Sequence, residues 1–355
     1  GQSVDGNSIS FKALEKITVE GEVLDASGQL VTDFTGIVNP TVKDSKVTVT
    51  CLKNSNKDDS PAFTFTDYPN TIFIGNDSVR NGKFSFTFTV PKDISYSNLQ
   101  GKMNLYAVDT ESGNEAQGNF DNFIVGGTSD TAETDTIGPE IRALYLNDTT
   151  FVDGGQVNTT PYFVAELWDK SGVNITGSSV GHDMMLVIDE STVLSYNLNS
   201  YYELLPGEDG TGIVKFPIPA LEPGKHTAEF WVWDILNNST VRTFTFEVVE
   251  GLKPFLFDVI ATPGIAREQV TFHLMHNRPE SRMRVGIMVY DLAGRQLWKH
   301  EESGTSGLFE NYTVSWDLTS GGARMRPGVY IYRAAISTDN SKDATKARKF
   351  IILGE

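Results

Sequence analysis

Residues 84–90 read Phe84-Ser85-Phe86-Thr87-Phe88-Thr89-Val90. An apolar side chain at every second position is typical of a strand that has one face on a core and the other in water. The same alternation recurs in residues 63–65 and 243–248. Turn-forming pairs such as Asn81-Gly82 separate these segments, and no long helical pattern interrupts them. The sequence therefore predicts an all-β protein of tandem immunoglobulin-like β-sandwich domains.

Changes in composition along the chain predict three such sandwiches. Residues 127–137 contain almost no apolar side chain and cannot bury a core, so we expect a polar linker there. This linker separates a first domain, residues 1–126, from a second domain, residues 138–250. Strand and turn signals continue through a third domain, residues 251–355. A chain of 355 residues is long enough for several independent cores.

The net charge of -17 is spread unevenly. Residues 131–250 carry 5 basic and 18 acidic side chains, whereas residues 251–355 carry 14 basic and 11 acidic ones. The acidic part would repel phosphates, which excludes nucleic acid as an expected partner. The basic third domain should present a surface of a different kind from its neighbours.

Cys51 and the pair His182-Asp183 are the two candidates for catalysis, and the sequence supports neither. Cys51 is the only cysteine, and it ends the alternating stretch 47–52, so we expect a small buried hydrophobe rather than a nucleophile. His182 and Asp183 are adjacent, but neighbours along a strand point to opposite faces. We expect this pair to brace a loop. The sequence also lacks the Gly-x-Ser-x-Gly motif of serine hydrolases. No catalytic residue is predicted in this chain.

Oxygen-bearing side chains at apparent strand ends make calcium a possible cofactor. Calcium takes about 6–8 oxygen ligands from carboxylates, amides and carbonyls. The candidate ligands are Asp135, Asp169, Asp183, Asp234 and Asn237. The capping of turns by Asp and Asn side chains explains the same residues without a metal. No other cofactor is expected.

The third domain contains a hairpin pattern, Val289-Tyr290-Asp291-Leu292-Ala293-Gly294-Arg295. Pro327-Gly328-Val329-Tyr330 follows, and residues 348–353 form a last strand pattern. These segments resemble the C-terminal signal domain of the type IX secretion system of Bacteroidetes. The chain departs from that family at Thr262-Pro263-Gly264, where Pro-Asn-Pro is common.

The second domain carries short blocks in a fixed order. They include Gly138-Pro139, Ser171-Gly172-Val173-Asn174, Gly181-His182-Asp183 and Val232-Trp233-Asp234. In this order they resemble the region that follows the peptidase domain in the gingipain-type sortase of type IX secretion.

The resemblance implies the non-catalytic C-terminal portion of a cell-surface sortase, a cysteine peptidase and transpeptidase. The parent enzyme would remove C-terminal signals from cargo and join the cargo to anionic lipopolysaccharide. The third domain would dock the enzyme on an outer-membrane β-barrel shuttle protein. Other expected partners are further attachment-complex proteins and cargo signal domains. We therefore expect a location at the cell surface, peripheral to the outer membrane of a Gram-negative Bacteroidetes bacterium.

Arginines of the third domain are the candidate contacts with the barrel, because guanidinium groups suit protein and phosphate interfaces. The candidates are Arg282, Arg284, Arg295, Arg324, Arg326 and Arg333.

Two other functions remain open from the residues. The chain could be a secreted adhesin or structural protein of tandem immunoglobulin-like domains with a removable type IX signal. It could also be a glycan-binding accessory module that uses Tyr201, Trp231 or Trp233.

Overall fold

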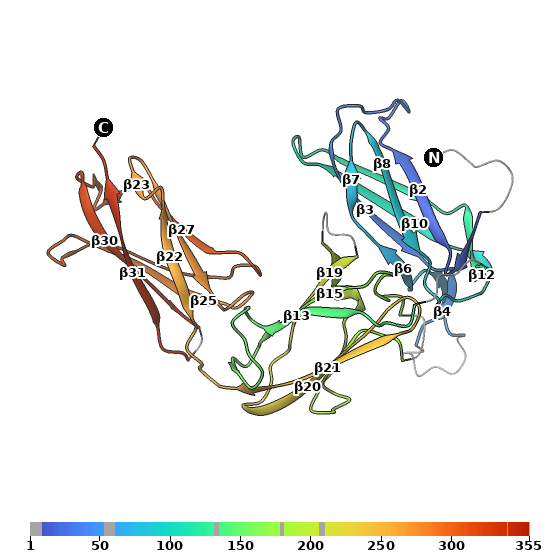
Figure 1. Ribbon diagram of the computed structural model, residues 1–355. Helices are drawn as coiled ribbons and strands as arrows, with labels where there is room; N and C mark the ends of the chain where they lie inside the picture. Colours follow the sequence, from blue (N-terminus) through green and yellow to red (C-terminus); the bar gives the residue numbers. More distant parts are fainter. Residues whose placement is uncertain are drawn as a thin grey trace. The chain divides into compact units, whose positions relative to one another are not determined.

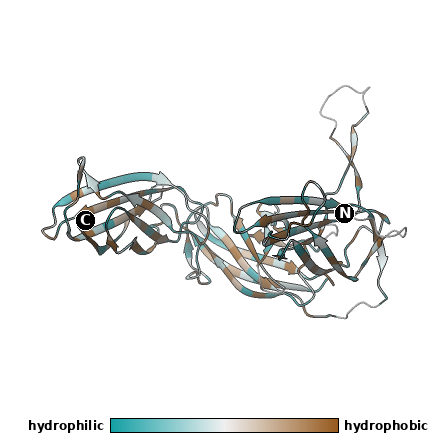
Figure 2. Ribbon diagram, turned by 90° about the horizontal axis from the view of Figure 1, so that it is seen from above, coloured by the Kyte–Doolittle hydropathy of each residue, from teal (hydrophilic) through white to brown (hydrophobic). Residues whose placement is uncertain are grey.

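The protein is nearly all β. The computed structural model describes residues 9–52, 61–130, 135–177, 181–205, 210–338 and 340–354. Within these ranges one short 3-10 turn, η1 (Asn199–Tyr201), is the only helical element, and every other element is a strand (Figure 1). No helix of the described residues is long and apolar enough to cross a membrane. Hydrophobic and hydrophilic residues alternate along many strands (Figure 2).

The chain divides into two compact units. Unit 1 comprises residues 1–144, 164–216 and 227–244, and unit 2 comprises residues 145–163, 217–226 and 245–355. The domain boundaries predicted from the sequence, at 126, 137 and 250, remain predictions.

The first twelve strands all belong to unit 1. They are β1 (Ile9–Ala13), β2 (Lys16–Glu22), β3 (Gly36–Lys43), β4 (Val47–Thr50), β5 (Thr64–Asp67), β6 (Thr71–Ile74), β7 (Asp77–Val79), β8 (Lys83–Thr89), β9 (Leu99–Gln100), β10 (Lys102–Asp109), β11 (Glu115–Phe120) and β12 (Phe123–Thr128). Their main sheets have the orders β1-β12-β9 and β11-β10-β3-β6, and β2 pairs with β8. One core lies between these sheets, with Phe11, Val42, Phe86 and Met103 among its members.

Strand β8 confirms the alternation that predicted it. Phe84, Phe86 and Phe88 are buried, while the hydroxyl residues between them face outward. The preceding Asn81-Gly82 pair forms the predicted turn, since both residues have positive φ and Arg80 and Lys83 exchange backbone hydrogen bonds.

Strands β4 and β5 form a hairpin of their own, with Val49 opposite Phe65. Its base is anchored by the buried Asp44, whose carboxylate accepts hydrogen bonds from Ser45 and Ser95. Cys51 lies just beyond β4 and is exposed. The expectation of a buried cysteine is therefore wrong, because the described residues leave the Cys51 side chain open to solvent.

Residues 140–248 form two further sheets. Their strands are β13 (Glu140–Leu146), β14 (Gln156–Val157), β15 (Tyr162–Trp168), β16 (Met185–Ile188), β17 (Ser195–Asn197), β18 (Tyr202–Leu204), β19 (Thr211–Pro217), β20 (Gly224–Trp233) and β21 (Ser239–Val248). The sheet orders are β13-β15-β19-β18 and β14-β21-β20-β16-β17. In β20, Phe230 and Val232 are fully buried, and Trp231 and Trp233 alternate with them on the other face.

The last ten strands lie in unit 2, and we call them the terminal sandwich. They are β22 (Leu256–Thr262), β23 (Ile265–Ala266), β24 (Val270–His276), β25 (Met283–Tyr290), β26 (Gln296–Gly304), β27 (Tyr312–Trp316), β28 (Thr319–Ser320), β29 (Ala323–Arg324), β30 (Gly328–Ser337) and β31 (Ala344–Ile352). A three-stranded sheet, β22-β24-β27, and a five-stranded sheet, β23-β31-β30-β25-β26, enclose one core. The predicted class, tandem β-sandwiches of the immunoglobulin-like kind, is confirmed.

The hairpin between β25 and β26 has the predicted turn. Asp291 Oδ1 accepts hydrogen bonds from the backbone N–H groups of Ala293 and Arg295. Gly294 adopts φ +81°, which a residue with a side chain resists.

Candidate functional site

Three of the five predicted calcium ligands lie together in unit 1. Carboxylate oxygens of Asp135, Asp169 and Asp234 are all within 4.8 Å of one another, and Asp169 and Asp234 are buried. Each carboxylate also caps a turn. Asp169 Oδ1 accepts the N–H groups of Ser171 at 2.7 Å and Gly172 at 2.9 Å.

The remaining carboxylates of this cluster are held in the same manner. Asp234 Oδ1 accepts the Asn238 N–H at 2.7 Å, and Asp135 Oδ2 accepts the Ser171 hydroxyl at 2.8 Å. Both explanations made from the sequence, turn capping and an oxygen-rich site, therefore apply to the same atoms.

Burial changes the acidity of the cluster. Burial, followed by the neighbouring charges of Asp234 and Asp135, raises the pKa of Asp169 to about 6, although hydrogen bonds from Gly172 and Ser171 act in the opposite direction. Burial also raises the pKa of Asp234. The backbone N–H of Ile137 and the Ser171 hydroxyl instead hold the pKa of Asp135 below its usual value. Three close carboxylates suit a hard cation, and calcium here remains a prediction.

The other two calcium candidates serve different contacts. Asp183 Oδ1 accepts a hydrogen bond from Asn199 Nδ2 at 2.7 Å. Asn237 Nδ2 donates to Asp93 Oδ1 at 2.8 Å. Neither belongs to the group formed by Asp135, Asp169 and Asp234.

His182 is bonded to a residue that no sequence pattern indicated. Its Nδ1 lies 2.6 Å from Oδ2 of Asp93, a residue with 9% of its surface exposed. Asn174 Nδ2 donates to the same oxygen at 3.3 Å, and the Trp233 ring lies 4.4 Å from the imidazole, centroid to centroid. The carboxylate accepts and the ring N–H donates, so this arrangement braces the loops of residues 93, 174 and 182.

The aromatic residues considered for glycan binding have partners within the protein. Trp233 packs against His182, and Trp231 Nε1 donates to Glu229 Oε2 at 3.2 Å. Tyr201 stands edge-on to Phe216 at 4.8 Å between ring centroids.

The six candidate arginines fall into two groups. Arg284 on β25 and Arg333 on β30 are exposed at outward positions of the five-stranded sheet. The other four are in turns and connecting segments or on the short β29. Arg295 forms an ion pair with Asp291 at 3.1 Å, and the Arg324 guanidinium contacts the backbone oxygen of Arg267. Arg282 precedes β25 and Arg326 precedes β30.

A buried arginine of unit 2 was not among these candidates. Arg278 is 1% exposed, and its guanidinium donates hydrogen bonds to the backbone oxygens of Leu252, Lys253 and Asn277. Burial lowers its pKa to about 10. The Arg278 backbone N–H donates to Nδ1 of His276 at 3.1 Å, and burial followed by the Arg278 charge lowers the pKa of His276 to about 4. These groups fix the segment that leads into β22.

Comparison with known proteins yields one informative relative. No protein-family model and no curated protein matches the chain. Among solved structures, dimeric latent PorU from Porphyromonas gingivalis shares 38% sequence identity, with a TM-score of 0.41. The match covers 98% of this chain and 32% of that chain, so the chain spans about a third of the length of PorU.

Two other solved structures are much less similar. The Ig1-2 module of the Drosophila receptor phosphatase DLAR is 10% identical, over 62% of this chain and 100% of that chain, with a TM-score of 0.24. The Bacteroides ovatus protein SGBP-B, solved with a mixed-linkage heptasaccharide, is 9% identical, over 100% of this chain and 68% of that chain, with a TM-score of 0.27. The all-β assignment rests on the strands themselves, and these two structures add nothing to it.

Proposed function

We propose that this chain is the non-catalytic C-terminal portion of a sortase of the type IX secretion system, similar to PorU. The observation that carries the proposal is 38% identity to PorU over 98% of the chain. The blocks of the second domain and the hairpin of the third domain, which resemble this kind of enzyme in sequence, agree with it.

The described residues favour a structural role for this portion over a catalytic one. The Nδ1 atom of His182 is engaged in its contact with Asp93, which braces loops. The parent protein is a gingipain-like cysteine peptidase in this proposal, and its catalytic residues lie in a different domain. The activity assigned to the parent is removal of C-terminal signals from cargo and attachment of the cargo to anionic lipopolysaccharide.

In this proposal the terminal sandwich docks the parent enzyme on an outer-membrane β-barrel shuttle protein at the cell surface. Its separate core and its excess of basic over acidic residues support that role, because a self-contained module can bind a partner as a unit. Other attachment-complex proteins and cargo signal domains would bind to the same assembly.

Deletion of residues 253–355 from the parent protein tests the docking role. We expect the truncated enzyme to lose co-purification with the barrel protein, while circular dichroism shows residues 1–250 still folded. Recovery of the truncated protein with the barrel at wild-type yield would refute the role. A mass measurement on surface-retained protein is the complementary test. A sortase keeps the terminal sandwich, whereas an adhesin with a removable signal loses it.

A further inference from the structure

The outward side of the five-stranded sheet in the terminal sandwich differs from the rest of the chain. Alternate residues of β25, β30 and β31 point into the core, including Ile287, Tyr332 and Phe350. The residues between them form what we call the outer face. It consists of Ile265, Arg284, Gly286, Met288, Tyr290, Lys299, Glu301, Ser303, Val329, Ile331, Arg333, Ala335, Thr345, Ala347, Lys349, Ile351 and Leu353.

One end of the outer face is apolar. Ile351 pairs with Ile265 on one side and Val329 on the other, so three aliphatic side chains lie in one row across neighbouring strands. Their exposed fractions are 36%, 55% and 41%, and Leu353, two residues beyond Ile351, is 38% exposed. Strands are about 4.8 Å apart, so these side chains form a continuous patch.

Cations follow the apolar row along the strands. Lys349 is two residues from Ile351, and Arg333 is four residues from Val329, or about 13 Å at the usual rise of a strand. Arg284 lies opposite Ser337, roughly 26 Å from the row. All three are exposed, and the ion pairs found among the described residues include none of them.

Acidic side chains are scarce on this face. Glu301 is its one carboxylate, and it forms an ion pair with Lys299 at 2.8 Å. Arg333 lies between Ala347 on β31 and Met288 on β25, and Gly286 pairs with Ala335 two residues further along β30. A chain with a net charge of -17 thus carries a locally positive face.

The outward side of the opposite sheet is a natural contrast. Its central row is Ile260, His273 and Thr313, and the next row is Thr262, Thr271 and Ser315. These rows carry hydroxyl groups and no Arg or Lys. These two rows therefore lack the cations of the outer face.

Along the outer face, apolar side chains are followed by cations, and this order matches the layers of a membrane leaflet. A leaflet presents an apolar layer and, several ångströms outside it, a layer of anionic phosphates. Aliphatic side chains at one end can enter the first layer while Lys349 and Arg333 extend toward the second, since long basic side chains bury their stems and keep their charge at the surface. Guanidinium groups bind phosphate oxygens well. An acidic protein would instead bind the outer face through carboxylates at fixed positions.

We infer that the outer face of the terminal sandwich binds a membrane leaflet that carries anionic phosphate headgroups. The occupant is lipid, bound through charge complementarity with Lys349 and Arg333 and through insertion of the row of Ile265, Ile351 and Val329. This contact is additional to docking on a barrel protein and does not depend on it.

Sedimentation of the whole 355-residue chain with vesicles tests the inference. The probes are vesicles of phosphatidylcholine alone and vesicles of equal parts phosphatidylcholine and phosphatidylglycerol. We expect binding to the second kind only, weakened about tenfold or more when the salt rises from about 0.05 M to about 0.5 M. The double variant Arg333→Glu with Lys349→Glu should lose about tenfold or more in affinity, and Val329→Ser with Ile351→Ser should also bind less. All four positions are outward-facing, so unchanged thermal unfolding is the check that the variants fold.

Thr271→Glu with Thr313→Glu on the opposite sheet is the matched control and should bind as the wild type does. Equal binding to both kinds of vesicle, no binding by the wild type, or an unaffected charge-reversal variant would each overturn the inference. Loss of barrel co-purification by the charge-reversal variant, with no vesicle binding by the wild type, would assign the face to an acidic protein surface instead. The deletion experiment measures binding to the barrel protein and not to lipid. The docking role and the lipid contact can therefore be refuted independently of each other.

Discussion

Asp93 and His182 are joined at 2.6 Å between Asp93 Oδ2 and His182 Nδ1, although 89 positions separate them in the sequence. Two amide side chains, from Asn174 and Asn237, also donate to the Asp93 carboxylate. A buried carboxylate needs such donors, because without them its desolvation is uncompensated.

The first prediction concerns this contact. His182→Ala removes a donor from a nearly buried carboxylate and should lower the free energy of unfolding by about 1–3 kcal/mol. Urea unfolding followed by tryptophan fluorescence measures the change. Asp183→Asn is the control, because Asn keeps the oxygen that accepts from Asn199, and it should stay within about 0.5 kcal/mol of wild type. Equal losses in the two variants would show that Asp93 does not need His182.

The second prediction is a pH dependence that arises from His276. Burial and the charge of Arg278 lower its pKa to about 4, from an ordinary value of 6.5. Between these values the unfolded chain binds a proton that the folded protein does not, so stability falls as the pH drops through this window. Protonation would also place a proton on Nδ1, which accepts the Arg278 N–H.

Urea unfolding at about pH 7 and about pH 5 checks this prediction. The loss of stability on acidification should be smaller in His276→Gln than in wild type, by roughly 1–2 kcal/mol. His273→Gln, on the outward side of the same strand, serves as the control and should keep the wild-type pH dependence. A wild-type response in His276→Gln would contradict the assignment.

The third prediction tests calcium at Asp135, Asp169 and Asp234. A cation bound there stabilises only the folded state, so millimolar calcium should raise the melting temperature of the wild type. Asp169→Asn should abolish that rise, whereas Asp183→Asn, outside the cluster, should preserve it. Scanning calorimetry with and without calcium measures both. If calcium leaves the wild-type melting temperature unchanged, turn capping is the whole role of these carboxylates.

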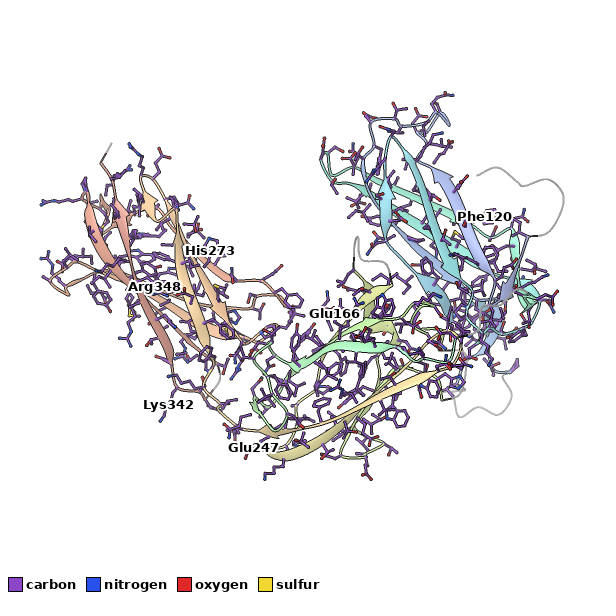
Figure 3. All side chains as sticks on the ribbon, in the orientation of Figure 1. Phe120, Glu166, Glu247, His273, Lys342 and Arg348 are labelled. Atoms are coloured by element: carbon purple, nitrogen blue, oxygen red, sulfur yellow. The ribbon has the colours of Figure 1, made fainter. Side chains whose placement is uncertain are left out.

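The fourth prediction compares how much stability is lost when either of two side chains of β31 is removed. Arg348, which is labelled in Figure 3, forms paired hydrogen bonds of 3.0 Å with Asp258 on β22, but this ion pair is partly exposed. Arg348→Ala should therefore cost only about 0.2–1 kcal/mol. Phe350, two residues on, is 1% exposed and contacts the rings of Phe272 and Tyr332. Phe350→Ala should cost about 3–5 kcal/mol. Chemical denaturation measures both losses. A larger loss from Arg348→Ala than from Phe350→Ala would contradict the prediction.

The strands were predictable because their signal is local. Alternation in residues 84–90, the Asn81-Gly82 turn and the Asp291–Gly294 turn each follow from neighbouring residues, and the structure confirms all three. The strand pattern predicted for residues 348–353 likewise overlaps β31 (Ala344–Ile352).

Contacts between distant segments were not predictable in the same manner. Nothing local distinguishes Asp93 from other loop aspartates, so its bond to His182 had no sequence signal. Cys51 continues an alternating stretch, but burial depends on whether another layer covers that stretch, and the described residues leave Cys51 exposed. Of the calcium candidates at strand ends, only those whose turns converge in space came together.

Strand β31 also determines when the terminal sandwich can form. It lies between β30 and the short parallel strand β23, and its Phe350 and Ile352 complete the core. During synthesis the earlier strands must wait for residues 344–352. Until then the side chains of Phe272, Trp316 and Tyr332 lack their ring contacts with Phe350. The terminal sandwich therefore completes its core only when β31 pairs with β30 and β23.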